Sequence, residues 1–376
     1  MENSGTNRGQ NGQEDRISAL PDELLHRILS SDVIKLNEVV RTCILSKRWV
    51  NLWRAFPVLH FTELGLALRN DKYVEFITKF LLGRAQQVET CLVNIDLRYG
   101  LDESVRSHVL LTLNQAVSHC VRELHIAEGK LDFELSFPVL TELTLYECDV
   151  SFTNWSLPFL TTLELYTVCP HGNETMLNFK DFPCLKNLNL GGLFYYSDPP
   201  GFVRIDPPNL ENLDIYQGGA IPIPGCKFVI SAPKLKCFRF YVRYVPVVSA
   251  EGGFPCLEEA WFSIYLGKGW SDIHMFFDED YRWDLAENET MLKLSNLFRE
   301  FRETKLLTIF SETFGVLSRL CNFFKYQPSP FVNLNSLYLR LRDKMLQLPN
   351  SNHLVIEYLL SNSPAAEFII QEPFLE

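Results

Sequence analysis

One six-residue pattern, L-x-x-L-x-L, recurs along the chain and constrains its fold more than any other feature. Leucine or another apolar residue fills most of its fixed places in units that begin at residues 92, 121, 140, 160, 185, 210, 235, 257, 306 and 334. Three successive intervals, from 160 to 235, are 25 residues long. A repeat of this period indicates a solenoid, in which each unit buries its apolar edge against the next.

A second marker falls at a constant distance from the first. Prolines at 138, 158, 183, 208, 233 and 255 each stand two residues before the first leucine of a unit. Proline can precede a strand but cannot donate to its hydrogen-bond ladder. The unit at Leu140 also runs on to Cys148 and Val150, which completes the longer form of a leucine-rich repeat. Together the two markers predict one structural unit, repeated along the chain.

These units predict an α/β fold, an irregular leucine-rich-repeat solenoid with a parallel sheet on its concave side. The last two apolar residues of each pattern point inward and their neighbours outward, because side chains alternate along a strand. The variable intervals predict irregular convex connections, some helical and some only loops. Apolar residues at helical spacing predict helices near residues 73–81, 103–120, 294–301 and 354–360, and residues 363–370 offer a last strand.

Residues 15–54 have a different texture and predict three short helices. Pro21 followed by two acidic residues is a typical helix start. Apolar residues then recur at helical spacing in three groups: Leu24, Leu25, Ile28 and Leu29; Val39, Val40, Cys43 and Ile44; Trp49, Leu52 and Trp53. Three short helices bury little surface alone, so their leftover apolar face predicts a docking surface.

The run I-S-x-L-P-D-E-L-L-H-R-I-L, followed by V-R-T-C-I-L-S-K-R-W-x-N-L-W, resembles a plant F-box. Residues 363–370, S-P-A-A-E-F-I-I, are similar to the FBD-type end of plant F-box/leucine-rich-repeat proteins. The resemblance implies a Skp-type adaptor as partner and, through it, a cullin–RING ubiquitin ligase. It also implies adaptor contacts at Leu20, Pro21, Leu24, Ile28 and Leu29, while Trp49 and Trp53 fill either the small core or the adaptor interface.

Two departures from the family pattern are visible. The usual Phe-Leu-Pro turn is missing after Leu29, and Ala366 stands where leucine is usual. The resemblance divides the chain into a disordered lead (1–14), an F-box (15–56), a linker with a capping helix (57–90), leucine-rich repeats (91–341) and an FBD-like C-terminal cap (342–376). An exposed acidic insertion is predicted within the repeats at 267–289.

Composition and motifs bear on what the chain binds and does. Lys plus Arg number 35 and Asp plus Glu number 46, so the net charge is −11, which disfavours nucleic acid as a partner. No apolar run is long enough to span a bilayer, and the polar start lacks a signal-peptide core, so no membrane contact and a cytoplasmic or nuclear location are expected. No metal-binding, phosphate-binding or nucleophile motif is present, so neither a cofactor nor enzymatic activity is expected.

The concave surface is the predicted target site. The position after the second inward residue of each unit forms one outward column, which begins with Arg98 in this register. The column holds tyrosines in four units, and the neighbouring column adds an arginine and a tryptophan. The candidates are Tyr146, Tyr166, Tyr216, Tyr241, Arg239 and Trp261. Aromatic and arginine side chains suit protein recognition, although tyrosine also favours strands and stacks on its neighbours.

The sequence therefore predicts a substrate-recognition subunit of an SCF-type ubiquitin ligase, which binds the adaptor at one end and an unknown target protein on its concave face. Two alternatives remain. One is a ligase-independent interaction scaffold, in which the N-terminal helices only cap the solenoid. The other is a small-molecule sensor with a ligand inside the horseshoe.

Overall fold

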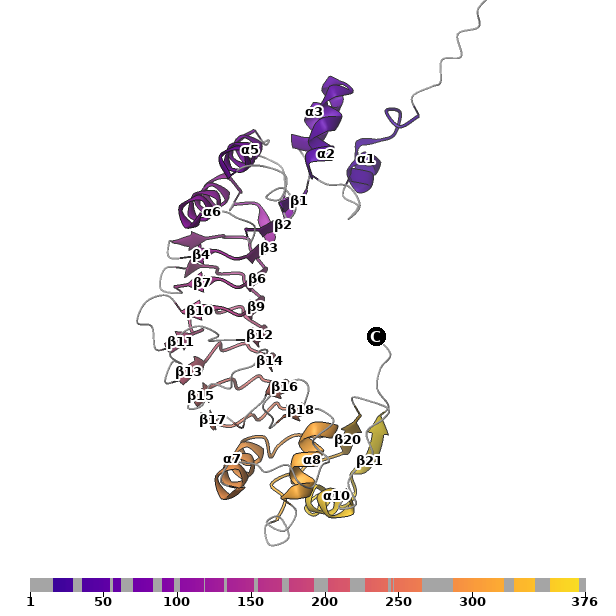
Figure 1. Cartoon of the computed structure of the whole chain (residues 1–376). Helices are drawn as coiled ribbons and strands as arrows, with labels where there is room; N and C mark the ends of the chain where they lie inside the picture. Colours follow the sequence, from indigo (N-terminus) through magenta and orange to yellow (C-terminus); the bar gives the residue numbers. More distant parts are fainter. Residues whose placement is uncertain are drawn as a thin grey trace, which may run out of the picture.

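The computed structural model describes most of the solenoid and the N-terminal helices. The described residues are 16–29, 36–54, 57–61, 70–83, 90–97, 102–117, 119–131, 134–151, 155–170, 176–192, 202–216, 227–242, 245, 247–265, 287–320, 328–341 and 352–371. They form an arc whose inner side is lined by one long sheet (Figure 1). The predicted lead at 1–14 and all but the last three residues of the predicted insertion at 267–289 lie outside the described residues.

All neighbouring strands of the inner sheet run parallel, as the repeat pattern predicts. Its 12 strands are, in order, β1 Val58–Phe61, β2 Thr90–Asp96, β3 Val121–Ala127, β6 Glu142–Tyr146, β9 Thr162–Tyr166, β12 Asn187–Gly191, β14 Asn212–Tyr216, β16 Cys237–Val242, β18 Glu259–Ile264, β19 Leu306–Phe310, β20 Ser336–Arg340 and β21 Glu367–Gln371. The parallel sheet and its mixed α/β surroundings are consistent with a leucine-rich-repeat solenoid.

The inward leucines of adjacent units lie opposite one another and form the core. Leu143 on β6 is opposite Leu163 on β9, which is opposite Leu188 on β12. Leu143 and Leu163 are completely buried, and Leu188 is 2% exposed. Each leucine thus packs against the equivalent residues of its neighbours, which is why the units stabilise one another and not themselves.

The repeated prolines lie in tight turns that lead into the strands. Leu140 N donates to Phe137 O at 3.3 Å, and Leu210 N donates to Pro207 O at 3.3 Å. Pro138 and Pro208 follow the acceptor residue in these turns, where proline's fixed φ is favourable and its missing N–H costs nothing. The same bond precedes β21, where Ala366 N donates to Ser363 O at 3.0 Å and Pro364 holds the equivalent place.

A left-handed residue ends four successive inner strands. Glu128, Glu147, Thr167 and Gly192 have φ values between 53° and 59°. Each donates its backbone N–H to the carbonyl that ends the next strand, for example Glu147 N to Tyr166 O at 2.8 Å. This shared bond offsets the cost of a positive φ at three residues that are not glycine.

Two units differ from the predicted register by two residues. Val93 and Ile95 lie opposite Leu124 and Ile126, so Ile95 is the last inward residue of its unit and not the middle one. Likewise, Leu307 and Ile309 lie opposite Leu337 and Leu339. A shift of two preserves the alternation of side chains, so the pattern alone allows both registers and strand pairing decides.

This correction changes the outward column at its start. Asp96 lies opposite Ala127, in the place predicted for Arg98, which is outside the described residues. In the same way Phe310 joins the column opposite Arg340, at a position the sequence pattern missed.

The convex side carries short parallel strands in the middle of the arc, where loops or helices were predicted. Three small sheets contain β4 Lys130–Leu131, β7 Asp149–Val150 and β10 Cys169–Pro170; β5 Leu135–Ser136 and β8 Trp155–Ser156; β11 Met176–Asn178, β13 Phe202–Ile205, β15 Lys227–Ile230 and β17 Val247–Ala250. Such strands of two to four residues are too short for the sequence pattern to reveal.

Helices lie at the two ends of the arc, around the strands (Figure 1). They are α1 Asp22–Leu29, α2 Leu36–Arg41, the 3-10 turn η1 Thr42–Ile44, α3 Lys47–Arg54, α5 Asn70–Leu82, α6 Glu103–Val117, α7 Glu287–Glu300, α8 Ser311–Arg319 and α10 Asn352–Leu360. The four helices predicted beyond residue 60 are confirmed as α5, α6, α7 and α10. None of the described helices is long and apolar enough to cross a membrane.

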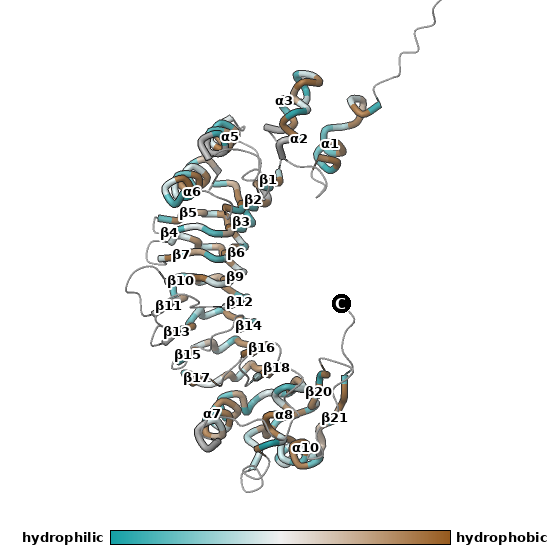
Figure 2. Tube along the Cα trace, viewed as in Figure 1, coloured by the Kyte–Doolittle hydropathy of each residue, from teal (hydrophilic) through white to brown (hydrophobic). Residues whose placement is uncertain are grey.

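Among the described helices beyond residue 60, α8 is the one that the sequence pattern missed. Its residues Ser311–Ser318 are all buried, including a serine, a glutamate and a threonine at its start. The helix has only nine residues and begins with three polar ones, so it offers few apolar residues at helical spacing. The hydropathy colouring of Figure 2 shows the polar and apolar residues mixed along the arc.

Candidate functional site

Arg48 connects helix α3 to the start of α1 through hydrogen bonds. Its guanidinium donates to the backbone oxygens of Ser18 and Leu20, the latter at 2.5 Å, and to Asp22 Oδ1 at 2.8 Å through Nε. Trp49, 4% exposed, donates from its indole nitrogen to Ser18 Oγ at 3.3 Å. These contacts fix the loop that precedes α1, and the sequence analysis assigned Arg48 no such role.

The predicted adaptor contacts divide into exposed and buried residues. Leu24 and Ile28 are 43% and 47% exposed on α1, whereas Leu29 and Trp49 are at most 5% exposed and belong to the core of the N-terminal helices. Leu20 is half-buried and Pro21 is exposed. The side chain of Trp53 lies outside the described residues. The role of each as an adaptor contact stays a prediction.

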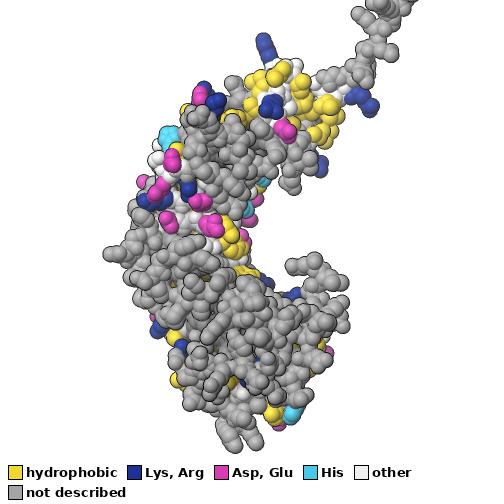
Figure 3. Space-filling model, in the orientation of Figure 1, with side chains coloured by type: hydrophobic (Ala, Val, Ile, Leu, Met, Phe, Trp, Pro, Cys, Tyr) yellow, Lys and Arg dark blue, Asp and Glu magenta, His cyan; other side chains and the backbone are white. Residues whose placement is uncertain are grey.

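Further apolar residues are exposed close by in the sequence. We call the set of Ile17, Leu24, Ile28, Ile44 and Leu45, each at least 43% exposed, the N-terminal apolar surface. Figure 3 shows hydrophobic side chains gathered over these helices. The sequence pattern placed Ile44 among the apolar residues of the second predicted helix. It is 88% exposed because the chain tightens into η1 after Arg41 and turns this residue outward.

On the concave sheet, the four predicted tyrosines stack in two pairs. The rings of Tyr216 and Tyr241 are parallel, 4.7 Å apart, and those of Tyr146 and Tyr166 are tilted, 6.3 Å apart. Tyr146 is exposed, and the other three are half-buried. Both the recognition role and the packing role considered from the sequence are therefore compatible with this geometry.

Gly191 separates the two pairs and makes room for Tyr166. A Cβ at Gly191 would lie 2.4 Å from Tyr166 Cδ1, so the tyrosine ring leans over β12 where a side chain is absent. The Tyr166 hydroxyl accepts a hydrogen bond from Asn189 Nδ2 at 2.8 Å. Burial, and then the Glu164 charge, raise the pKa of Tyr166 to about 12.

Arg239 and Trp261, the predicted members of the second column, are linked through a cation–π contact. The Arg239 guanidinium lies 5.2 Å from the Trp261 ring centre and pairs with Asp214, with Nη1 3.1 Å from Oδ2. Arg340 approaches the same ring at 5.3 Å and the Phe310 ring at 5.7 Å. Phe310 was missed as a member of this cluster because its unit was assigned the wrong register.

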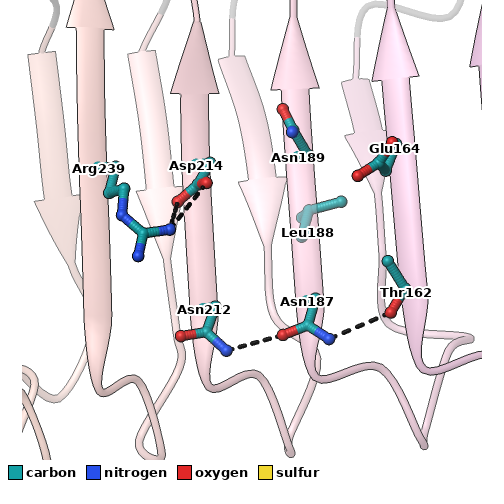
Figure 4. Close-up of a pocket in the computed structure, with 8 residues that line it drawn as sticks. All are labelled: Thr162, Glu164, Asn187, Leu188, Asn189, Asn212, Asp214 and Arg239. Carbon is teal, nitrogen blue, oxygen red and sulfur yellow. Dashed lines mark hydrogen bonds and ion pairs between the residues drawn. The ribbon is translucent and has the colours of Figure 1, made fainter. Parts of the chain in front are cut away.

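A shallow hollow of about 260 Å³ lies beside this cluster, across four strands (Figure 4). It is lined by Thr162, Glu164, Asn187, Leu188, Asn189, Asn212, Asp214 and Arg239. Asn212 donates to Asn187, which donates to Thr162, so one wall is a ladder of polar side chains. Within the described part of the chain, Asn189 Oδ1 is buried without a hydrogen-bond partner, which typically costs about 1–3 kcal/mol.

The environment of this hollow disfavours the ionised form of the Asp214 carboxyl group. Burial raises its pKa, and the attraction of Arg239 only partly opposes that effect. Charged groups kept at such a cost on a surface mark candidate binding positions. Within the described ranges no group of three or more His, Cys, Asp or Glu side chains is arranged to hold a metal ion. The hollow offers donors, acceptors and aromatic faces, which suit recognition.

Comparisons with known proteins find relatives among plant proteins named for an F-box and leucine-rich repeats. An F-box/LRR-repeat protein of Arabidopsis thaliana is 30% identical over 240 residues, covering 62% of this chain and 70% of the relative. An F-box/FBD/LRR-repeat protein of the same plant is 26% identical over 402 aligned residues, covering 96% and 82%. A second F-box/LRR-repeat protein from this plant is 27% identical over 375 residues, covering 93% and 86%.

No protein-family profile matches the chain. A crystal structure from Bacteroides fragilis covers 77% of both chains at 14% identity, but its TM-score of 0.26 is too low to support an argument. The conclusion rests on the curated relatives, whose names carry the F-box, the leucine-rich repeat and the FBD. The chain belongs to the F-box/leucine-rich-repeat family of plants.

Proposed function

We propose that this chain is the substrate-recognition subunit of an SCF-type ubiquitin ligase. Its N-terminal helices act as the F-box and bind a Skp-type adaptor, which connects them to a cullin. The concave sheet binds a target protein. The chain carries out no chemistry itself and contributes by holding the target near the enzyme that transfers ubiquitin. A cytoplasmic or nuclear location accompanies this proposal.

The observation that carries the proposal is the N-terminal apolar surface. Leu24 and Ile28 are one helical turn apart on α1 and both nearly half exposed, although Leu25 and Leu29 on the same helix are buried. An exposed group of large apolar residues marks an interaction site. Family membership supports the choice of partner, because relatives of this chain are named as F-box proteins and a Skp-type adaptor is the partner that an F-box implies.

The adaptor role is tested with the purified full-length chain and a Skp-type adaptor. We expect wild-type protein to retain the adaptor in a pull-down, and Leu24→Asp to lose it, because the complex would bury an unpaired charge. Leu111→Asp is the matched control, since Leu111 is 39% exposed on α6, far along the chain from this surface.

A folded Leu24→Asp protein that still retains the adaptor in full would contradict the assignment of this surface. A wild-type chain that retains no adaptor at micromolar concentration would favour the ligase-independent scaffold. Circular dichroism of each variant separates loss of binding from loss of folding.

The target role is tested by comparing the proteins that co-purify with wild type and with Tyr166→Ala/Tyr216→Ala. We expect the variant to bind the adaptor normally and to lose target proteins, because interface tyrosines combine large contact area with little side-chain entropy. Losing the stacking of Tyr216 on Tyr241 costs about 1 kcal/mol, too little to unfold the solenoid.

Phe159→Ala provides the control for the target experiment. Phe159 is an aromatic residue, 59% exposed, in the turn before β9 and outside the tyrosine column. An unchanged list of partners in the double tyrosine variant would place the target site elsewhere on the chain.

A further inference from the structure

The concave sheet carries an uneven distribution of charge. The outward positions of the strands from β2 to β14 hold no lysine or arginine but five carboxylates: Asp96, Glu123, Glu142, Glu164 and Asp214. Arg122 and Lys186 lie next to these columns in the sequence, at the entry edge of the sheet. From β16 onward the outward positions include Arg239 and Arg340. One half of the concave face is thus acidic.

The hollow lies at the boundary between the two halves. Figure 4 shows Glu164 on β9 and Asp214 on β14 flanking Asn189 on the strand between them. Two strand spacings separate these carboxylates, roughly 10 Å between backbones. Asn189 Oδ1, at the centre, has no donor among the described residues. The hollow therefore holds one acceptor without a donor among the described residues.

The same corner already holds one guanidinium of the chain itself. Arg239 pairs with Asp214 on its β16 side and lies over the Trp261 ring. On the opposite side of the hollow, Glu164 accepts a hydrogen bond from the Thr144 hydroxyl at 3.3 Å, which holds this carboxylate near Tyr166. A carboxylate beside an aromatic ring is an arrangement that binds a guanidinium, which pairs with the carboxylate and stacks on the ring.

We infer that the hollow receives an arginine side chain from a basic segment of the target protein, with Glu164 and Asn189 as acceptors and Tyr166 as the aromatic face. The inference rests on the proposed target-binding role and names the chemistry of the target. Arginine suits the site better than lysine, because its planar group donates several hydrogen bonds at once and stacks on a ring. The acidic half of the sheet draws a basic segment toward it.

The experiment selects short random peptides, displayed on phage, against the immobilised full-length chain. We expect wild type to enrich arginine at one peptide position. A selected peptide should bind Glu164→Gln on the order of tenfold more weakly, as should the peptide with its arginine replaced by lysine. Glu164→Gln keeps an amide oxygen that can accept from the Thr144 hydroxyl, so its thermal midpoint should match wild type.

Glu357→Gln is the control, since it removes the same charge from an exposed position on α10. Its affinity for the selected peptide should equal that of wild type. Equal enrichment of arginine on Glu164→Gln overturns the site, and equal affinity for arginine and lysine peptides overturns the preference. Selection of peptides without a basic residue, or of none, overturns the inference as a whole.

These failures are distinct from failure of the proposed function. Adaptor retention does not involve Glu164. If the capture of targets depended on Tyr166 and Tyr216 but not on Glu164, the proposed receptor role would be retained. Only the assignment of an arginine to the hollow would be rejected.

Discussion

The concave sheet and the N-terminal helices place their leucines differently. In the sheet, Leu143, Leu163 and Leu213 are completely buried, and the outward positions carry polar and aromatic residues. On helix α1, Leu25 and Leu29 are buried, but Leu24 and Ile28 are nearly half exposed. The sheet completes its own core, whereas the helices leave apolar surface that a partner can cover.

Under the proposed function, this difference assigns two kinds of recognition to two regions of one chain. Apolar burial, which the N-terminal apolar surface offers, gives affinity with little discrimination between partners of similar shape. The sheet offers fixed charges, amides and rings, whose mismatch with a wrong partner is costly. A constant partner at one end and a selected partner in the middle fit this division.

The largest effect expected from this comparison is on folding. Leu188→Ala should lower the free energy of unfolding by about 2–5 kcal/mol, because Leu188 lies between Leu163 and Leu213 and its loss leaves a cavity. Leu24→Ala should change it by no more than about 0.5 kcal/mol. Chemical denaturation of both variants measures the contrast, and similar midpoints for the two would show that the inward register is misassigned.

The next effect concerns adaptor binding. Leu24→Ala should weaken the adaptor complex roughly tenfold to a hundredfold, the equivalent of about 1.5–3 kcal/mol of lost apolar burial. Leu188→Ala, at temperatures where it stays folded, should bind the adaptor as wild type does. Titration calorimetry gives both values, and a larger loss for Leu188→Ala would mean that the two regions are not independent.

A smaller effect is expected at Gly191. A methyl group there would collide with the Tyr166 ring, so Gly191→Ala should displace the ring and break the bond from Asn189 to its hydroxyl. We expect a stability loss of about 1–2 kcal/mol, since the half-buried ring can move aside. Adding Tyr166→Ala to Gly191→Ala should remove most of this loss. A loss that persists in the double variant would mean that the strain lies in the backbone.

The smallest effect is a change of stability with pH at Asp214. Burial raises the folded-state pKa of this carboxyl above its unfolded value, so its ionisation opposes folding. The penalty is absent below the unfolded pKa of about 4 and complete above the folded pKa. Asp214→Asn should therefore gain stability relative to wild type as the pH rises from about 4 to neutrality.

Thermal midpoints across this pH range test the Asp214 prediction. If raising the pH instead increased the thermal midpoint of wild type relative to that of Asp214→Asn, the ion pair with Arg239 would outweigh the cost of burial.

Local pattern determined much of this protein. The spacing of leucines is enough to identify the inward positions, the parallel sheet and most of the helices, because each unit repeats the same alternation of side chains. The prolines mark the turns for the same reason. The resemblance of residues 15–54 to an F-box also depends on a contiguous run of residues, and the relatives of the chain bear that family out.

Only the tertiary structure decided the features that depend on how strands pair and how turns are formed. Strand pairing fixed Ile95 and Ile309 two residues from the predicted register and so brought Asp96 and Phe310 into the outward column. The lean of Tyr166 over Gly191, the exposure of Ile44 and the hollow beside Asp214 likewise depend on neighbouring strands and turns. The alternation of side chains in the sequence has a period of two, so it cannot distinguish two registers that differ by two residues. The hydrogen bonds between paired strands select one of these registers.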